Sequence, residues 1–154
     1  MSKNFLIDTK TYIEVKCHFI EEEKTSKNDN EDVQTIVRTY IPSEIFDQMS
    51  PDDFDGKKLS YAIGSFRKPT YKSYYLIKTK SLTIDTRTKI LYTHPARLEN
   101  EIINTLLFAI QDKSGNRTDI TNENKVDYIG NIDPVIVNGL SKEFMKVCGA
   151  NFVD

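Results

Sequence analysis

Histidine and cysteine supply many of the nucleophiles and general bases in enzymes, and this chain contains two of each. Cys17 and His18 are neighbours in a segment with period-two alternation, so their side chains point to opposite faces and cannot pair. Cys148 falls at the expected end of a helix, where the helix dipole raises the pKa of a thiol. The pattern argues against a cysteine hydrolase, and we expect both cysteines to be reduced and buried.

Carboxylates and glycines are the next candidates for chemistry, as ligands of metals and phosphates. The segment Asp52–Gly56 resembles a fragment of a calcium-binding loop. However, Pro51 stands at the first ligand position, and Ala62 stands where the loop needs a glutamate. The six glycines form no phosphate-binding motif. We predict no catalytic residue, no metal and no cofactor, although carboxylates or tyrosines brought together by the fold could still form an enzyme site.

The strongest signal is a segregation of charge along the chain. Residues 19–55 contain eleven acids and three bases, a net charge of −8, whereas residues 56–97 contain ten bases and one acid, a net charge of +9. The net charge of −2 for the whole chain hides these two blocks. Aromatic rings are interleaved with the bases of the second block: Tyr61, Phe66, Tyr71, Tyr74, Tyr75 and Tyr92.

Three interpretations of this asymmetry remain open. The two blocks simply adjoin within one fold, or the acidic surface of one subunit docks on the basic surface of the next and builds rings or tubes. Alternatively, a basic sheet bearing tyrosines binds single-stranded nucleic acid, with Lys72, Tyr74, Lys78 and Lys80 as its candidate residues. On a strand these four would share one face, which leaves a single ring for stacking a base. We therefore expect nucleic-acid binding less than assembly.

Alternation of apolar and polar residues predicts the strands that position these groups. The clearest run is 11–20, where Ile13, Val15, Cys17 and Phe19 share one face. A second run at 33–41 would pair with it as a hairpin, with the polar segment 21–32 as a flexible acidic tip. Three further strands are expected at 58–66, 71–80 and 82–92, the last broken near 85–88, and a short one at 126–129.

From Pro95 the apolar period changes to 3.6 residues, which predicts an amphipathic helix over 95–113 that ends at Ser114-Gly115. A shorter C-terminal helix is expected to begin near Leu140 and end at Gly149. The fold class predicted from these elements is α+β. Residues 1–154 would form a single domain in which one long and one shorter helix cover an antiparallel sheet of about five to six strands.

One residue on the predicted long helix suggests a partner. Phe108 falls outside the apolar stripe, among polar neighbours that include Arg97 and Glu101. An apolar ring in such a position predicts contact with a second surface, either the C-terminal helix of the same chain or a partner subunit. The candidate interface residues are therefore Phe108, Arg97, Glu101 and the acidic run Glu21, Glu22 and Glu23.

The functional expectation is a non-enzymatic structural or protein-interaction subunit that self-associates through complementary charge, with other protein subunits as alternative partners. Lysine outnumbers arginine by 16 to 5, which is typical of low-GC genomes. Together with the small size, this favours a bacteriophage virion component such as a connector, ring or tail part. No apolar run approaches the length of a membrane span, so we expect no membrane partner and a cytoplasmic location, or assembly into a virion in a bacterial host cytoplasm.

Overall fold

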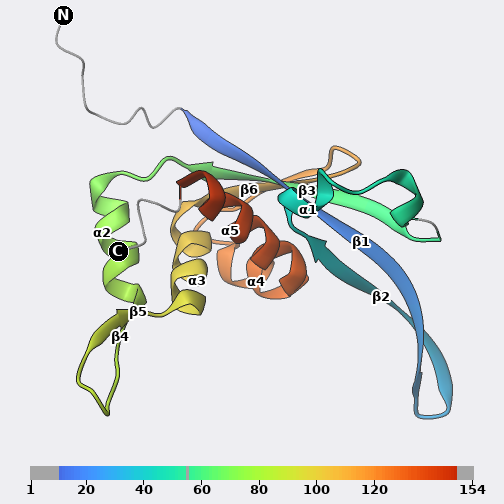
Figure 1. The fold of residues 1–154 in the computed structure, drawn as a ribbon, viewed down its shortest axis with the longest axis horizontal. Helices are drawn as coiled ribbons and strands as arrows, with labels where there is room; N and C mark the ends of the chain where they lie inside the picture. The colour runs from blue at the N-terminus through green and yellow to red at the C-terminus, as the bar shows by residue number, and fades with distance from the viewer. Residues whose placement is uncertain (1–10, 55, 149–154) are drawn as a thin grey trace, which may run out of the picture.

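The computed structural model describes residues 11–54 and 56–148 (Figure 1). Five strands form an antiparallel sheet in the order β2-β1-β3-β6-β7, and two short strands, β4 and β5, form a separate hairpin. The strands of the sheet are β1 (Tyr12–Asn28), β2 (Glu31–Ile41), β3 (Lys58–Arg67), β6 (Leu107–Asp112) and β7 (Arg117–Asp119). The hairpin consists of β4 (Leu82–Ile84) and β5 (Leu91–Thr93).

Helices pack on both faces of this sheet: the C-terminal helix covers the face that carries Cys17, and the short helix after β2 lies on the face that carries His18. The helices are α1 (Ser43–Phe46), α2 (Tyr71–Ser81), α3 (Pro95–Leu106), α4 (Lys125–Asn131) and α5 (Pro134–Cys148), with the 3-10 helix η1 (Pro51–Phe54). The alternation in the first strand is confirmed, because Val15, Cys17 and Phe19 are all buried. The ring of Phe144 on α5 stacks on Phe66 of β3 at 4.5 Å between centroids. The predicted α+β class with an antiparallel sheet is therefore confirmed.

The segment expected as a strand at 71–80 is instead the helix α2. Thr70 and Ser73 form a capping box, in which the backbone N–H of each residue donates to the side-chain hydroxyl of the other at 2.8 and 3.2 Å. Ile77 and Ser81, one helical turn apart, are buried. The cap and the tertiary packing thus outweigh the strand preference of a Tyr- and Thr-containing run.

The helix predicted over 95–113 ends early, at Leu106, and the next residue begins β6. Within this helix the predicted apolar stripe is confirmed, because its members are buried: Leu98, Ile102, Ile103 and Leu106. Beyond that point β6 pairs with β3 on one side and β7 on the other, so strand pairing replaces the helix. The C-terminal helix α5 has 15 residues against 12 in α3, so the expected order of helix lengths is wrong.

Two smaller expectations change and a third is confirmed. The strand expected at 126–129 lies within the helix α4. The run 82–92 divides at the expected break, where Asp85 accepts hydrogen bonds from the backbone of Arg87 and Thr88. The acidic segment 21–32 is paired strand on both sides of a tight turn with positive φ at Asp29 and Asn30, which joins β1 to β2. Gly149, the predicted end of the last helix, lies outside the described residues.

Candidate functional site

The end of the β1–β2 hairpin extends beyond the rest of the sheet. Pairing of β1 with β3 stops at Glu21↔Lys58, whereas pairing with β2 continues for seven more residue pairs, to Asn28↔Glu31. At roughly 3.3 Å per residue this ribbon is about 20 Å long. We call residues 22–37 the arm; Figure 1 shows it reaching away from the helices at one end of the molecule. A two-stranded ribbon with no third strand and no helix packed on it is marginally stable in water, so a partner that covers it would stabilise it.

The arm carries apolar side chains that the described chain leaves partly exposed. Val33, Ile36 and Val37 are between 37% and 48% exposed. The register places Val33 and Val37 on one face of the ribbon and Ile36 on the other. The charged residues of the arm are mostly acidic: Glu22, Glu23, Asp29, Glu31 and Asp32 against Lys24 and Lys27. The arm therefore combines β-branched apolar contacts with a net negative charge.

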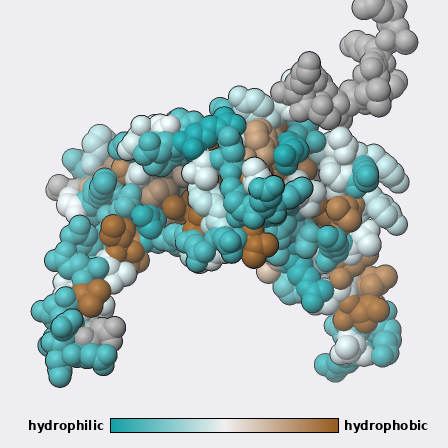
Figure 2. Space-filling view, turned by 180° about the vertical axis from the view of Figure 1, so that it is seen from behind, coloured by the Kyte–Doolittle hydropathy of each residue, from teal (hydrophilic) through white to brown (hydrophobic). Residues whose placement is uncertain are grey.

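The β4–β5 hairpin is a second projection, at the opposite end of the long axis in Figure 1. Its register brings Leu82, Ile84 and Leu91 to one face, and all three are exposed. Arg87 and Lys89 lie in its turn. Figure 2 shows hydrophobic side chains on both projections, separated by the mostly hydrophilic surface of the body.

Helix α2 precedes this second projection and presents two tyrosines to solvent. Tyr71 is 81% exposed and Tyr75 61%, and their rings stack at 6.4 Å between centroids. Tyr74 is instead partly buried against the core, the reverse of what a strand would give. Of the other candidate nucleic-acid residues, Lys72 and Lys80 are exposed and Lys78 is partly buried. We call residues 71–93 the basic end.

The structure separates the six interface candidates. Phe108 lies on β6 and not on a helix, where it meets Tyr12 edge-on at 5.6 Å and lies 5.2 Å from the Arg67 guanidinium. Its contacts within the chain remove the argument that it needs a partner. Arg97 is exposed on α3, and Glu101 lines a hollow of about 600 Å³ between α3 and α2.

The three glutamates lie where the arm leaves the sheet. Glu21 forms an ion pair with Arg38 at 3.7 Å, and Arg38 also binds Asp133 at 3.0 Å. Glu22 pairs with Lys57 at 3.6 Å. The acidic and basic blocks thus meet within the chain at this point, as the simplest interpretation of the charge pattern predicted. Glu21, Glu22, Glu23 and Lys57 line a groove of about 540 Å³.

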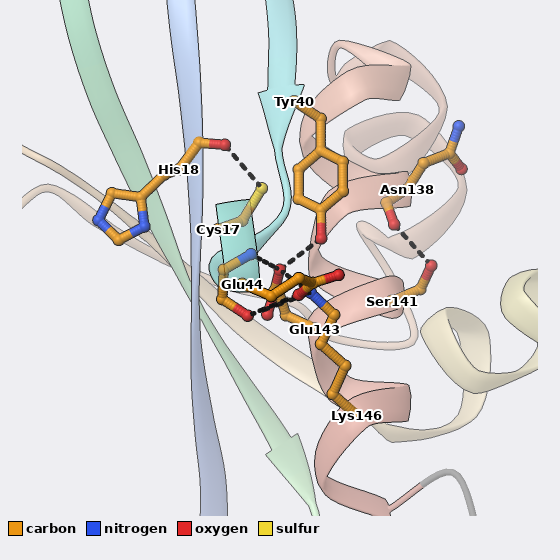
Figure 3. Close-up of polar contacts among 9 residues, drawn as sticks. Cys17, His18, Tyr40, Glu44, Asn138, Ser141, Glu143 and Lys146 are labelled. Carbon is orange, nitrogen blue, oxygen red and sulfur yellow. Dashed lines mark hydrogen bonds and ion pairs between the residues drawn. The ribbon is translucent and has the colours of Figure 1, made fainter. Parts of the chain in front are cut away.

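A buried carboxylate joins α5 to the end of β2 and to α1 (Figure 3). Glu143 is only 7% exposed. Its Oε1 accepts hydrogen bonds from the Tyr40 hydroxyl, from the backbone N–H of Ser43 at 3.1 Å and from Lys146 Nζ at 2.9 Å. Lys146 also pairs with Glu44. No spacing in the sequence relates residue 40 to residue 143, so sequence reasoning missed this cluster.

The chemistry of this cluster suits a structural role, in which it holds α5 to the end of β2 and to α1. Burial would raise the pKa of Glu143, but the hydrogen bonds from Tyr40, Lys146 and Ser43 lower it overall, so the carboxylate stays ionised. Burial, with Glu143 nearby, raises the pKa of the Cys17 thiol to about 12. Figure 3 shows Cys17 and His18 on opposite sides of β1, as their adjacency predicted. A protonated thiol facing away from the histidine is a poor nucleophile.

A groove of about 700 Å³ runs beside this cluster, between the end of β2, β5, α3 and α5. Its apolar lining includes Tyr40, Leu91, Leu98 and Met145, and Lys146 lies at its charged rim. Because Leu91 belongs to the β4–β5 hairpin, the groove continues the surface of the basic end. It therefore offers room for a chain that docks there.

Within residues 11–54 and 56–148, no three His, Cys, Asp or Glu residues are grouped so that they could hold a metal ion. No helix in the same part of the chain is long and apolar enough to cross a membrane. Asp55 of the calcium-loop fragment lies outside the described residues. Comparison of the chain with models of protein families, with curated proteins and with solved structures gives no match.

Proposed function

We propose that this protein is a non-enzymatic assembly subunit that binds further copies of itself through the arm. The observation that carries the proposal is the projecting ribbon, seven residue pairs long, with three exposed apolar side chains. Ordering such a segment costs conformational entropy, and the arm buries little apolar surface of its own in return. Contact with a neighbouring subunit would supply the missing burial.

The proposal is also supported by the state of the groups that are best suited to catalysis. Cys17 is fully buried as a thiol, and Glu143 is held by three donors. His18 stacks on Phe46 at 3.8 Å between centroids. Each of these side chains already serves packing or an internal hydrogen bond. The finer assignment, a ring, connector or tail part of a phage-type virion, rests on composition and on the two projections at opposite ends.

The arm can be tested by removing its apolar atoms while keeping its β-branched shape. We expect Val33→Thr/Ile36→Thr/Val37→Thr to weaken self-association roughly a hundredfold, because each side chain forgoes about 1 kcal/mol of apolar burial. Sedimentation velocity over a range of protein concentrations measures the change. The matched control is Val126→Thr/Val147→Thr, which makes the same exchange at two exposed valines on α4 and α5 and should assemble like wild type.

Two results would count against this proposal. A wild-type protein that stays monomeric at every concentration has no self-association to explain. A triple variant that assembles as tightly as wild type, with an unchanged circular dichroism spectrum, would exclude the arm as the contact.

Binding of single-stranded nucleic acid is the second candidate function, and one observation favours it. The exposed, stacked pair Tyr71 and Tyr75 lies on α2 beside Lys72, which offers two ring faces and a nearby cation. Stacking on such rings contributes about 1 to 3 kcal/mol per base. This surface is a helix and not the basic sheet that the sequence predicted.

A further inference from the structure

We infer that the arm of one copy docks on the basic end of a second copy, α2 and the β4–β5 hairpin, in a head-to-tail contact. This inference rests on the proposed self-association and names the surface that receives the arm. The two surfaces belong to the same chain but lie at opposite ends of it (Figure 1). Each copy would therefore offer an arm to one neighbour and a receiving surface to another.

Charge decides between this arrangement and a symmetric one. The arm has five acids and two lysines. The basic end has one acid, Asp85, against Lys72, Lys78, Lys80, Arg87 and Lys89. An arm-to-arm contact would bring like charges together, and so would a contact between two basic ends. The head-to-tail contact is the one that pairs opposite charges.

Apolar surface is available on both sides of this contact. One face of the arm offers Val33 and Val37, and one face of the β4–β5 hairpin offers Ile84 and Leu91. Hydrophobic side chains are visible on both projections in Figure 2. Burying them against each other would provide affinity, and the charges would set the orientation.

The placement of the two projections determines what such a contact builds. They point toward the same side of the body from opposite ends of its long axis (Figure 1). A head-to-tail contact leaves one arm and one receiving surface unused at the ends of any chain of subunits, so it propagates until it closes. The product is a ring if the rotation between neighbours closes and a filament if it does not.

The contact can be tested by mixing two disabled variants. The first is the arm variant Val33→Thr/Ile36→Thr/Val37→Thr, and the second is the hairpin variant Ile84→Thr/Leu91→Thr. Each alone should lose association roughly tenfold or more, because one half of every contact is impaired. Mixed in equal amounts they should form a one-to-one heterodimer, since the first keeps its receiving surface and the second keeps its arm. The dimer should grow no further, as its two remaining surfaces are the disabled ones.

Other outcomes distinguish the possible errors. If the hairpin variant still assembles alone while the arm variant does not, the arm binds elsewhere and the head-to-tail contact is wrong. If the mixture stays monomeric although wild type assembles, the contact is also wrong. A monomeric wild type overturns the proposed function itself. A charge variant of the basic end, Lys80→Glu/Arg87→Glu, leaves the apolar residues in place. It should associate with itself less tightly than wild type does, yet form the same one-to-one heterodimer with the arm variant, so the inference stays testable if Ile84→Thr/Leu91→Thr fails to fold.

Discussion

Gly139 allows α5 to approach the sheet closely. A Cβ atom at this position would lie 2.3 Å from Cys17 Sγ and 2.9 Å from Cδ2 of the Tyr40 ring. Both neighbours belong to strands that pair with each other, so neither can move without disturbing the sheet. The absence of a side chain therefore sets how near the helix lies to β1 and β2. It also allows Glu143, one turn further on, to reach Tyr40.

We predict that Gly139→Ala destabilises the protein by about 1 to 3 kcal/mol, because overpacking outweighs the gain in helix propensity of about 1 kcal/mol. Gly130→Ala in α4 is the matched control, since a Cβ there meets nothing within 4 Å. This control should leave stability unchanged or raise it slightly. Urea denaturation of the two variants measures the difference. Equal midpoints would show that the tight approach at Gly139 is unimportant.

Glu143 should make stability depend on pH in the acid range. Its pKa in the folded protein lies below its ordinary value, because three hydrogen bonds outweigh the opposing effect of burial. Its stabilising contribution is therefore complete above the unfolded pKa of about 4.3 and is lost as pH falls through the lower folded value. Glu143→Gln should cost about 1 to 3 kcal/mol at neutral pH and progressively less below about pH 4.

The measurement is the difference in unfolding free energy between wild type and Glu143→Gln at several pH values. Glu14→Gln serves as the control, because Glu14 is exposed on the outer face of β1. A difference that stays constant between pH 7 and pH 3 would mean that the charge of Glu143 does not contribute.

Secondary structure could be predicted from the sequence wherever local pattern and tertiary burial agree. Strand β1 is such a case, because one face of its first half is buried along its length. Helix α2 is the opposite case, since its strand-like composition competes with the capping box at Thr70 and Ser73. That cap was readable from the sequence, but no local signal showed that Ile77 is buried one turn from Ser81. Likewise, α3 and β6 form one apolar run, and only pairing with β3 divides it after Leu106.

The candidate surfaces were predictable to a similar degree. The acidic segment 21–32 and the basic residues after it are evident in the sequence. The exposure of Val33 and Val37 is not evident in the sequence, because the two residues alternate with polar residues as they would in any half-buried strand. It follows from the end of β3 pairing at Glu21↔Lys58, which leaves this part of the hairpin without a third strand. Phe108 is the opposite case. The sequence predicted that it is exposed on a helix, but α3 ends two residues before it.

Across the whole molecule, the two charge blocks are partly neutralised and partly separated. They meet at the junction of β1 and β3, where Glu22 pairs with Lys57. Away from this junction the two blocks separate. Acids continue toward the end of the arm, and bases continue toward α2 and the β4–β5 hairpin (Figure 1). The molecule thus carries charges of opposite sign at the two ends of its long axis. Such a distribution favours head-to-tail association in solution.

We therefore predict that self-association weakens as salt rises and is unaffected by a single-stranded oligonucleotide. The Debye length falls from about 10 Å at 0.1 M to about 3 Å at 1 M ionic strength, so charge attraction between subunits is screened while apolar contact persists. Sedimentation at two salt concentrations, with and without the oligonucleotide, measures both effects. The variant Lys80→Glu/Arg87→Glu should self-associate more weakly than wild type, and its self-association should depend much less on salt. Lys16→Glu/Lys113→Glu, which makes the same change of charge on β1 and in the β6–β7 turn, outside the basic end, should retain the salt dependence of wild type.

If an oligonucleotide binds at low salt and dissociates the assembly, the result would instead indicate that α2, with Tyr71 and Tyr75, binds nucleic acid. In that case binding should also fall steeply with salt, because each phosphate contact releases counterions from the strand. If association of the protein alone strengthens with salt, the contact is chiefly apolar and the charge argument fails. The joint outcome expected here is weaker assembly at high salt and no effect of the oligonucleotide, because the apolar contacts of the arm on the basic end cannot be made by a phosphate backbone. An arm of the same charge sign as a nucleic acid repels it and is drawn to the basic end of another copy.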